Sequence, residues 1–353
     1  MTAKSRTRLL RRPDIASLTT ISAPYFEELS RGQGFESPGL TVSDGHSFLH
    51  LALFGDRMPL PLDKSLCEQV TGRANVLVHP CVVANIAIGQ STAPTQRVKA
   101  NLFYSDFLHR QPVWKGDTLR TRTEVIALRR NRPREGKDAT GLAVLRITTF
   151  NQHDEIVLSF MRCPMLPCRD DHCHGDSSDD IDTFRAEPTA AELLSACPKD
   201  WDLSLLRERC DGPVAESLSP GQVFSVESFD TVLDATLLVR ATLNMAQVHT
   251  DSTSSHIGER LVYGGHTISM ASAQVSRALP GIATIVGWQA CNHIGPVMEG
   301  DRLSTQVEVV GVAPLTSGGG LCDLRAETFS SGSRQTGEER SKVLDWRYSV
   351  LMC

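Results

Sequence analysis

His109-Arg-Gln-Pro-Val-Trp-Lys-Gly-Asp-Thr-Leu-Arg-Thr-Arg-Thr-Glu-Val125 returns later in the chain as His293-Ile-Gly-Pro-Val-Met-Glu-Gly-Asp-Arg-Leu-Ser-Thr-Gln-Val-Glu-Val309. The offset between the two stretches is 184 residues (293 − 109), and nine positions are identical in both. Three further pairs follow the same order: 29–35 with 218–224, 77–78 with 261–262, and 145–150 with 324–329. Matches at a nearly constant offset indicate an internal duplication. The chain is therefore read as one fold written twice.

Length and composition agree with two ordinary globular domains. The chain has 353 residues, of which 41% are hydrophobic and 22% charged, enough for each half to bury its own core. A net charge of −5 gives no basic field for nucleic acid, and no apolar run approaches the roughly 20 residues that span a membrane. Ten cysteines without a Cys-x-x-Cys pair suggest reduced thiols, and we expect a cytoplasmic protein.

Each half shows the same order of predicted elements. Apolar helical patterns cover 80–90 and 266–278, and the first has almost no polar face, which predicts burial on all sides. Alternating, β-branched strands are expected at 118–128, 142–151 and 155–165, and again at 302–312, 321–330 and 342–352. One buried helix followed by antiparallel strands predicts an α+β fold, with a sheet wrapped around a central helix.

Four segments follow from these patterns. Residues 1–20 form a basic tail, which is favoured over a transit peptide, and 21–167 form the first repeat. Residues 168–212 form an acidic linker and a connecting helix that begins with the capping box of Thr189 and Glu192 and runs to about Cys197. His172-Cys173-His174 inside this linker is interpreted as solvated chain rather than a metal site. Residues 213–353 form the second repeat.

Two short motifs precede the predicted central helices. The first is Gly55-Asp-Arg-Met-Pro-Leu-Pro-Leu-Asp63. The second is Leu243-Asn-Met-Ala-Gln-Val-His-Thr-Asp251, followed by Tyr263-Gly-Gly-His266. The first resembles the Gly-Asp-x-Asn-Pro-Leu-His-x-Asp motif of MaoC-like, (R)-specific enoyl-CoA hydratases, but Pro61 replaces the histidine. The second keeps His249, and the whole chain resembles the mesaconyl-CoA hydratase branch of that family, whose members are double hot dogs.

The resemblance implies a site in the second half. Its expected catalytic residues are His249, Asn244, Gln247 and Asp251. Its expected substrate-binding residues are Tyr263, Gly264, Gly265, His266 and Arg260, with Arg260 as a candidate clamp for a second carboxylate on the acyl group. The implied reaction adds water to an α,β-unsaturated CoA thioester, with a histidine moving protons and a helix N-terminus stabilising the enolate. No metal and no separate cofactor are expected, because CoA is part of the substrate.

Asn244 stands where the family has its catalytic aspartate, and an amide cannot accept a proton. Either His249 works with Asn244 and Gln247 orienting water, which we prefer, or Asp251 or Glu259 supplies the carboxylate. His293 recurs in the first half as His109, so a structural role is favoured for it.

Two other functions remain open. A hot-dog thioesterase is disfavoured because the predicted helix at 266–278 carries no acidic residue. A non-catalytic acyl-CoA-binding module would also tolerate the loss of motif residues. A homodimer is possible, and no nucleic acid or membrane partner is expected.

Overall fold

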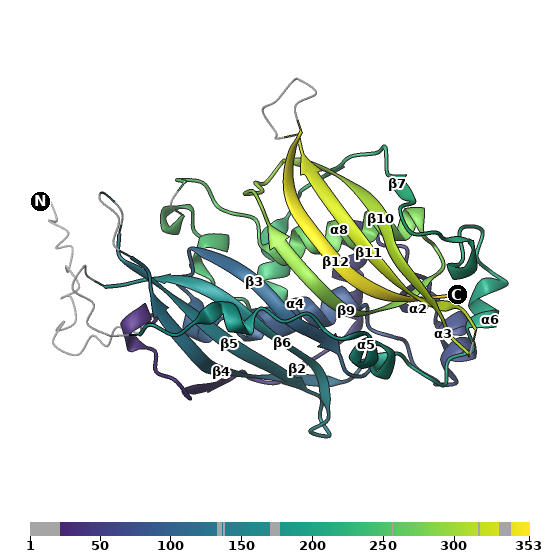
Figure 1. The fold of residues 1–353 in the computed structure, drawn as a ribbon, viewed down its shortest axis with the longest axis horizontal. Coiled ribbons are helices and arrows are strands. Elements are labelled where there is room, and N and C mark those ends of the chain that lie inside the picture. Colours follow the sequence, from purple (N-terminus) through teal and green to yellow (C-terminus); the bar gives the residue numbers. More distant parts are fainter. Residues whose placement is uncertain are drawn as a thin grey trace, which may run out of the picture.

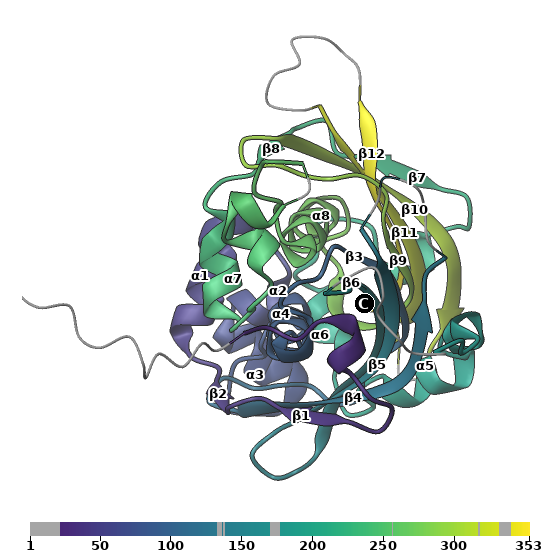
Figure 2. The ribbon, with the colours of Figure 1, turned by 90° about the vertical axis from the view of Figure 1, so that its left-hand side faces the viewer.

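The computed structural model describes residues 22–132, 136, 138–169, 177–255, 257–316, 318–331 and 340–353. Twelve strands form one antiparallel sheet with the order β1-β4-β5-β6-β3-β9-β12-β11-β10-β7, and β2 and β8 extend β4 and β10. The sheet curves around two central helices, α4 and α8, in the end-on view (Figure 2). The predicted basic tail and residues 170–176 of the linker, including His172-Cys173-His174, lie outside the described residues.

The two halves contribute corresponding strands and a corresponding central helix, and the first half adds the short helices α2 and α3; the elements are labelled in Figures 1 and 2. The first half contains β1 (Gly34–Glu36), β2 (Leu40–Thr41), α1 (Asp44–Phe54), α2 (Pro59–Leu62), α3 (Lys64–Thr71), α4 (Pro80–Gln90), β3 (Ala100–His109), β4 (Thr118–Arg130), β5 (Thr140–Phe150) and β6 (Ile156–Pro167). The connection carries α5 (Ala190–Ala196) and α6 (Leu203–Arg207). The second half contains β7 (Val223–Ser225), β8 (Asp230–Thr231), α7 (Ala235–Ala241), α8 (Gly264–Ala278), β9 (Ile282–His293), β10 (Arg302–Pro314), β11 (Gly320–Ser330) and β12 (Ser341–Met352).

The two halves join edge to edge. Strands β3 and β9 occupy equivalent places in the two repeats and pair antiparallel, with Phe107 opposite Trp288 and Leu108 opposite Gly287. The rings of Phe107 and Trp288 stack at 3.6 Å between centroids. The predicted double hot-dog architecture is confirmed, and this junction makes it one continuous sheet.

The central helices α4 and α8 contact each other through residues at equivalent positions of the two repeats. Every residue of α4 is buried, as its apolar sequence predicts. Asn85 of α4 donates a hydrogen bond from Nδ2 to Oγ of Ser269 on α8, at 2.9 Å. These two residues are repeat mates (269 − 85 = 184), so this contact lies where the pseudo-two-fold axis crosses the helix pair.

Several sequence predictions need correction. Helix α8 begins at Gly264 rather than at His266, because Tyr263 is the last extended residue before it. Strands β3 and β9 were not predicted, although they form the junction, and neither were helices α1 to α3, which precede α4. The connecting helix α5 is confirmed, with the Thr189–Glu192 capping box formed as expected. No helix in the described ranges is long and apolar enough to cross a membrane.

Candidate active site

A cavity of about 390 Å³ lies between the halves, at the N-terminal end of α8. Four of the predicted site residues line it: Asn244, His249, Tyr263 and Gly264. The opposite wall comes from the first half and includes Thr92 after α4, Tyr104 on β3 and Arg162 on β6. The cavity is therefore built by both repeats, although the motif lies in one.

The motif loop is held by the first half. The backbone N–H of Met245 donates to Oγ1 of Thr92 at 2.8 Å, and the N–H of Gln247 donates to the carbonyl of Gln96 at 2.8 Å. The loop starts with Leu243 at φ 57°, an uncommon conformation for a residue with a side chain. The Oδ1 atom of Asn244 accepts from the N–H of Ala246 at 2.9 Å, so its amide oxygen holds the turn. These bonds place Asn244 and His249 on the same cavity.

His249 is held in one tautomer. Its Nδ1 atom lies 3.1 Å from the carbonyl oxygen of Leu261, and a carbonyl can only accept, so Nδ1 carries the proton. The Nε2 atom is then the basic nitrogen of the neutral ring. Burial lowers the pKa of His249 to about 4, and the charge of Arg260 adds to this effect, against the hydrogen bond to Leu261. At neutral pH, His249 is a free base beside the cavity.

The start of α8 completes this side of the cavity. Gly264 lines it and Gly265 does not. A Cβ on Gly264 would lie 2.6 Å from Nε2 of His293, and one on Gly265 would collide with Oδ1 of Asn85. Both glycines are therefore explained by tight packing of the helix end against His293 and α4, rather than by room for substrate alone. The first N–H groups of a helix lack partners inside it and carry its positive dipole end.

The structure places the other predicted residues away from the cavity. Asp251 is exposed, caps the 3₁₀ turn Ser252–Ser254 and bonds Thr253, and these hydrogen bonds lower its pKa. The side chain of Gln247 does not line the cavity. These positions count against Asp251 as the missing carboxylate and against Gln247 as a water ligand.

Arg260 and His266 also lie outside the lining of the cavity. Nη2 of Arg260 lies 3.0 Å from Oε2 of Glu299, and the arginine does not line the cavity, so it is not placed to clamp substrate. His266 is completely buried, with its ring against Phe54 at 4.8 Å between centroids, and it too is absent from the lining.

Sequence reasoning missed several cavity residues. His293 lines the cavity although a structural role was favoured for it, and burial together with His249 lowers its pKa to about 4. Tyr104 and Arg162 lie on strands far from the motif in sequence, so the motif does not point to them. One signal was available for Arg162: it is the one charged residue of the strand 156–167, and it stands at a buried position.

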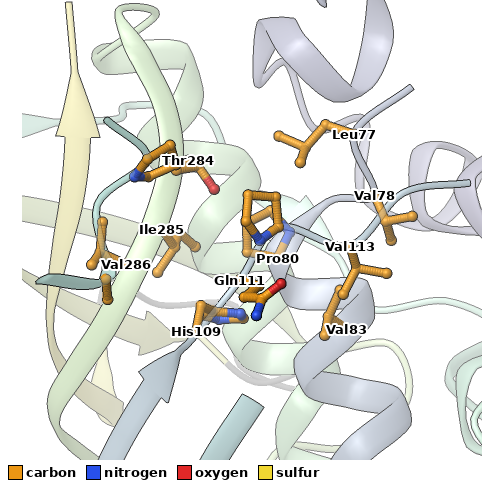
Figure 3. A pocket seen from close by; sticks show the side chains of 13 residues that line it. Leu77, Val78, Pro80, Val83, His109, Gln111, Val113, Thr284, Ile285 and Val286 are labelled. Atoms are coloured by element: carbon orange, nitrogen blue, oxygen red, sulfur yellow. The ribbon is translucent and has the colours of Figure 1, made fainter. Parts of the chain in front are cut away.

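The equivalent place in the first half is almost filled. Its cavity measures about 20 Å³ and is lined by Pro80, His109 and the connector residues Ala196 and Pro198 (Figure 3). Pro80 is the mate of Gly264, and His109 the mate of His293 (both offset by 184). The connection between the repeats thus helps to close the first copy of the site.

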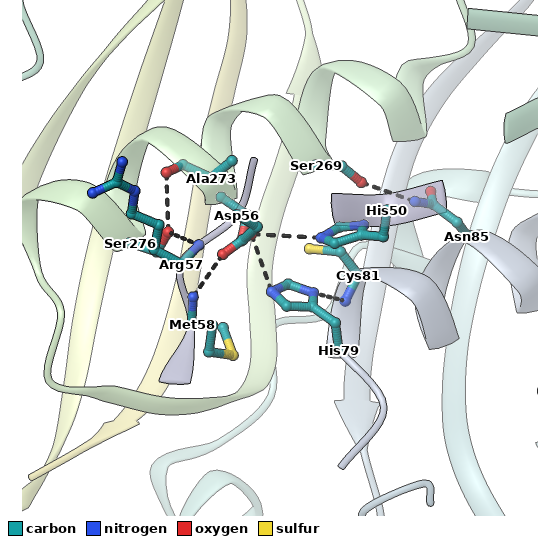
Figure 4. A network of polar contacts seen from close by, with 11 residues as sticks. His50, Asp56, Arg57, Met58, His79, Cys81, Asn85, Ser269, Ala273 and Ser276 are labelled. Carbon is teal, nitrogen blue, oxygen red and sulfur yellow. Dashed lines mark hydrogen bonds and ion pairs between the residues drawn. The ribbon is translucent and has the colours of Figure 1, made fainter. Parts of the chain in front are cut away.

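A buried polar cluster occupies the rest of that copy (Figure 4). Oδ2 of Asp56 lies 3.1 Å from Nε2 of His79, 3.6 Å from Nε2 of His50 and 3.1 Å from Oγ of Ser272. The backbone N–H of Met58 donates to Oδ1 at 3.0 Å. Neither histidine belongs to the sequence motifs described above. The sequence gives no signal for their meeting, because they lie on separate elements.

The cluster has the residue types of a metal site, with ligand atoms within 4.8 Å of one another. However, Nδ1 of His79 accepts from the N–H of Cys81 at 3.1 Å, which leaves the proton on Nε2, facing Asp56. A protonated nitrogen cannot bind a metal. The arrangement fits a hydrogen-bonded buried carboxylate instead, whose negative charge raises the pKa of His79 while His79 lowers that of Asp56.

Two curated proteins are similar to this chain over nearly its whole length. The chain is 28% identical to mesaconyl-CoA hydratase of Cereibacter sphaeroides over 338 residues, covering 93% of this chain and 96% of that one. It is 26% identical to beta-methylmalyl-CoA dehydratase of Chloroflexus aurantiacus, covering 95% and 99%. No family model matches the chain.

Solved structures extend the comparison. A Mycobacterium tuberculosis protein described as having a double hot-dog fold superposes with a TM-score of 0.87 at 42% identity, covering 94% of this chain and 99% of that one. A MaoC domain protein dehydratase of Chloroflexus aurantiacus superposes with a TM-score of 0.82 at 24% identity, covering 95% and 99%. The chain belongs to the MaoC-like double hot-dog family of hydratases and dehydratases.

Proposed function

We propose that this protein adds water across the double bond of a CoA thioester whose acyl group carries a second carboxylate, as in mesaconyl-CoA, or catalyses the reverse dehydration. The observation that carries this proposal is the single tautomer of His249, a free base on the open cavity beside the start of α8. The two relatives named for mesaconyl-CoA and beta-methylmalyl-CoA, similar over nearly the whole chain, support the substrate class.

The proposed steps follow from the residues on the cavity. A water bonded to Nε2 of His249 attacks the β-carbon, a C–O bond forms, and the water proton passes to Nε2. The electrons of the double bond move to the thioester oxygen, where the N-terminal end of α8 at Gly264 stabilises the enolate. His249 then returns the proton to the α-carbon.

Asn244 acts in this proposal by position. Its Oδ1 atom accepts from Ala246, which leaves the two Nδ2 hydrogens to donate toward the cavity. An amide donor orients the attacking water but takes no proton from it. The single base His249 therefore serves both proton transfers.

The competing activities are tested by the same assay. Neither central helix carries an aspartate or glutamate, which disfavours a thioesterase that activates water on that helix. The proposed reaction needs no added metal or redox cofactor. A homodimer and a cytoplasmic location stay predictions.

The test is incubation of purified protein with mesaconyl-CoA, crotonyl-CoA and their hydrated products. Loss of the enoyl-thioester absorbance, with the hydroxyacyl-CoA recovered by mass spectrometry, is the expected result. Release of free thiol would instead identify a thioesterase. Binding without conversion of any enoyl-CoA would identify a binding module.

A further inference from the structure

Arg162 is a buried cation on the wall of the open cavity. It lies on β6, only 3% of its surface is exposed, and it lines the cavity. Its Nη2 atom donates to the carbonyl of Ser91 at 2.8 Å and to Oγ1 of Thr95 at 2.8 Å. Its Nε–H has no acceptor, and no carboxylate in the described ranges pairs with it. A buried charge is normally paired, because desolvation makes an isolated one unfavourable.

Two phenols lie on the same part of the cavity. Tyr104 pairs directly with Arg162 across β3 and β6, so the two side chains share a face of the sheet. Tyr263 lies on the facing wall, and its buried Oη atom has no hydrogen-bond partner in the described structure. Burial raises the pKa of both tyrosines, so both remain protonated donors, and the charge of Arg162 acts on each. A guanidinium and two neutral O–H donors around one cavity are a suitable set of partners for a carboxylate.

The first copy of the site lacks this set. Leu145 faces Arg162 across β5 and β6, and its repeat mate Leu324 faces Tyr348 across β11 and β12. Tyr104 faces Arg162, and its mate Trp288 faces Tyr348. Tyr348 and Trp288 are therefore the mates of Arg162 and Tyr104. The cation is present only where the cavity is open.

We propose that Arg162 binds the free carboxylate of the acyl group, with Tyr104 and Tyr263 as additional hydrogen-bond donors, and so selects dicarboxylic over monocarboxylic thioesters. This inference rests on the proposed function and gives it a specificity residue. It also assigns that residue to the half without the catalytic motif, in place of Arg260, which pairs with Glu299.

Arg162 also contacts Ser91, the residue that caps the C-terminal end of α4, so a structural role must be separated from recognition. The deciding quantity is the ratio of kcat/KM for mesaconyl-CoA to that for crotonyl-CoA, measured on one protein preparation, because a loss of folded protein cancels in it. In Arg162→Met we expect this ratio to fall by about 10²- to 10⁴-fold, mostly through kcat/KM for mesaconyl-CoA. Thr95→Val is the matched control: it removes one hydrogen bond of Arg162 but keeps the charge, and the ratio should change less than about fivefold.

A binding experiment tests the same preference without requiring the protein to convert its substrate. Calorimetry compares methylsuccinyl-CoA with isobutyryl-CoA, two saturated thioesters of which only the first has a carboxylate. We expect the parent to prefer methylsuccinyl-CoA by at least about tenfold and Arg162→Met to lose the preference, with Arg162→Lys intermediate because it keeps the charge without the planar fork.

The two proposals fail separately. A parent that hydrates neither enoyl-CoA but prefers methylsuccinyl-CoA through Arg162 overturns the proposed function and supports this inference. A parent that hydrates enoyl-CoA with an unchanged ratio in Arg162→Met overturns this inference alone. If Arg162→Met does not fold, the preference of the parent and of Arg162→Lys decides, and equal binding of the two saturated thioesters by the parent overturns the assignment.

Discussion

The two copies of the site share a backbone and differ in what fills them. The second holds a cavity of about 390 Å³ and the first about 20 Å³. Besides the connector that closes the first cavity, five side chains differ at equivalent places: Asn244 against Asp56, His249 against Pro61, Tyr263 against His79, Gly264 against Pro80, and Arg162 against Tyr348. The first copy of the site has become a packed core around a buried carboxylate. Other residues of the first half form one wall of the second cavity and hold its motif loop. Under the proposed function, the second copy carries out the reaction and the first half supports it.

The largest expected effect is on kcat and comes from removing the histidine of the second copy. His249→Ala should lower kcat by about 10²- to 10⁴-fold, because it removes the base that moves both protons. Steady-state loss of the enoyl absorbance measures it, with circular dichroism to confirm the fold. Pro61→His in the His249→Ala background is the control, and we expect no recovery because the first cavity is closed. Full activity of folded His249→Ala would refute the assignment.

The next effect concerns the sealed copy. Asp56→Asn should lower the free energy of unfolding by about 2–4 kcal/mol, because His79 and Ser272 lose a buried charged acceptor, while kcat of the folded protein stays within about threefold. Urea denaturation measures the stability. Asp251→Asn, at an exposed position, should change it by less than about 1 kcal/mol. If Asp56→Asn were as stable as the parent but had a much lower kcat, Asp56 would take part in the reaction, and the first copy of the site would be catalytic.

A smaller effect sharpens the role of Asn244. Burial lowers the pKa of His249 to about 4, so kcat/KM of the parent should fall only as pH drops toward that value, well below the 6.5 of an ordinary histidine. Asn244→Asp adds a negative charge that favours the imidazolium, so the acidic limb should move to higher pH, by about one unit. Any alkaline limb due to loss of the same proton should move the same way. Superimposable pH profiles would show that Asn244 does not face His249.

The smallest effect tests the support from the first half. Thr92→Val removes the acceptor for the N–H of Met245, and loss of one hydrogen bond that positions the loop should lower kcat about three- to tenfold. Thr41→Val, which removes an exposed hydroxyl contact with Thr118, is the control and should leave kcat unchanged. An unaltered kcat in Thr92→Val would mean that the loop holds its shape alone.

Sequence could predict what is local or repeated. The duplication, the apolar helix at 80–90 and the alternating strands follow from residue order, and the fold with them. Strands β3 and β9 were missed because they are buried by the other half as well as by their own helix, which weakens the alternation of polar and apolar residues. The motif located His249 and Asn244, and both line the cavity. Arg162 and Tyr104 come from strands distant in sequence, and their meeting with the motif depends on the edge-to-edge junction, which a pattern within one half does not contain.

The hydrogen bonds from Met245 and Gln247 to Thr92 and Gln96 have a consequence for how such a chain can evolve and be assembled. A single repeat released from its partner would have no support for its loop and would expose the edge of β9, a template for misassociation. During synthesis the end of α4 is made well before the motif loop that hydrogen-bonds to it. The first half can therefore serve as the surface against which the second half folds. The first half has no histidine at the motif position, and the second half needs the first to hold its motif loop. Neither half could therefore work as a separate protein. The duplication is therefore difficult to reverse.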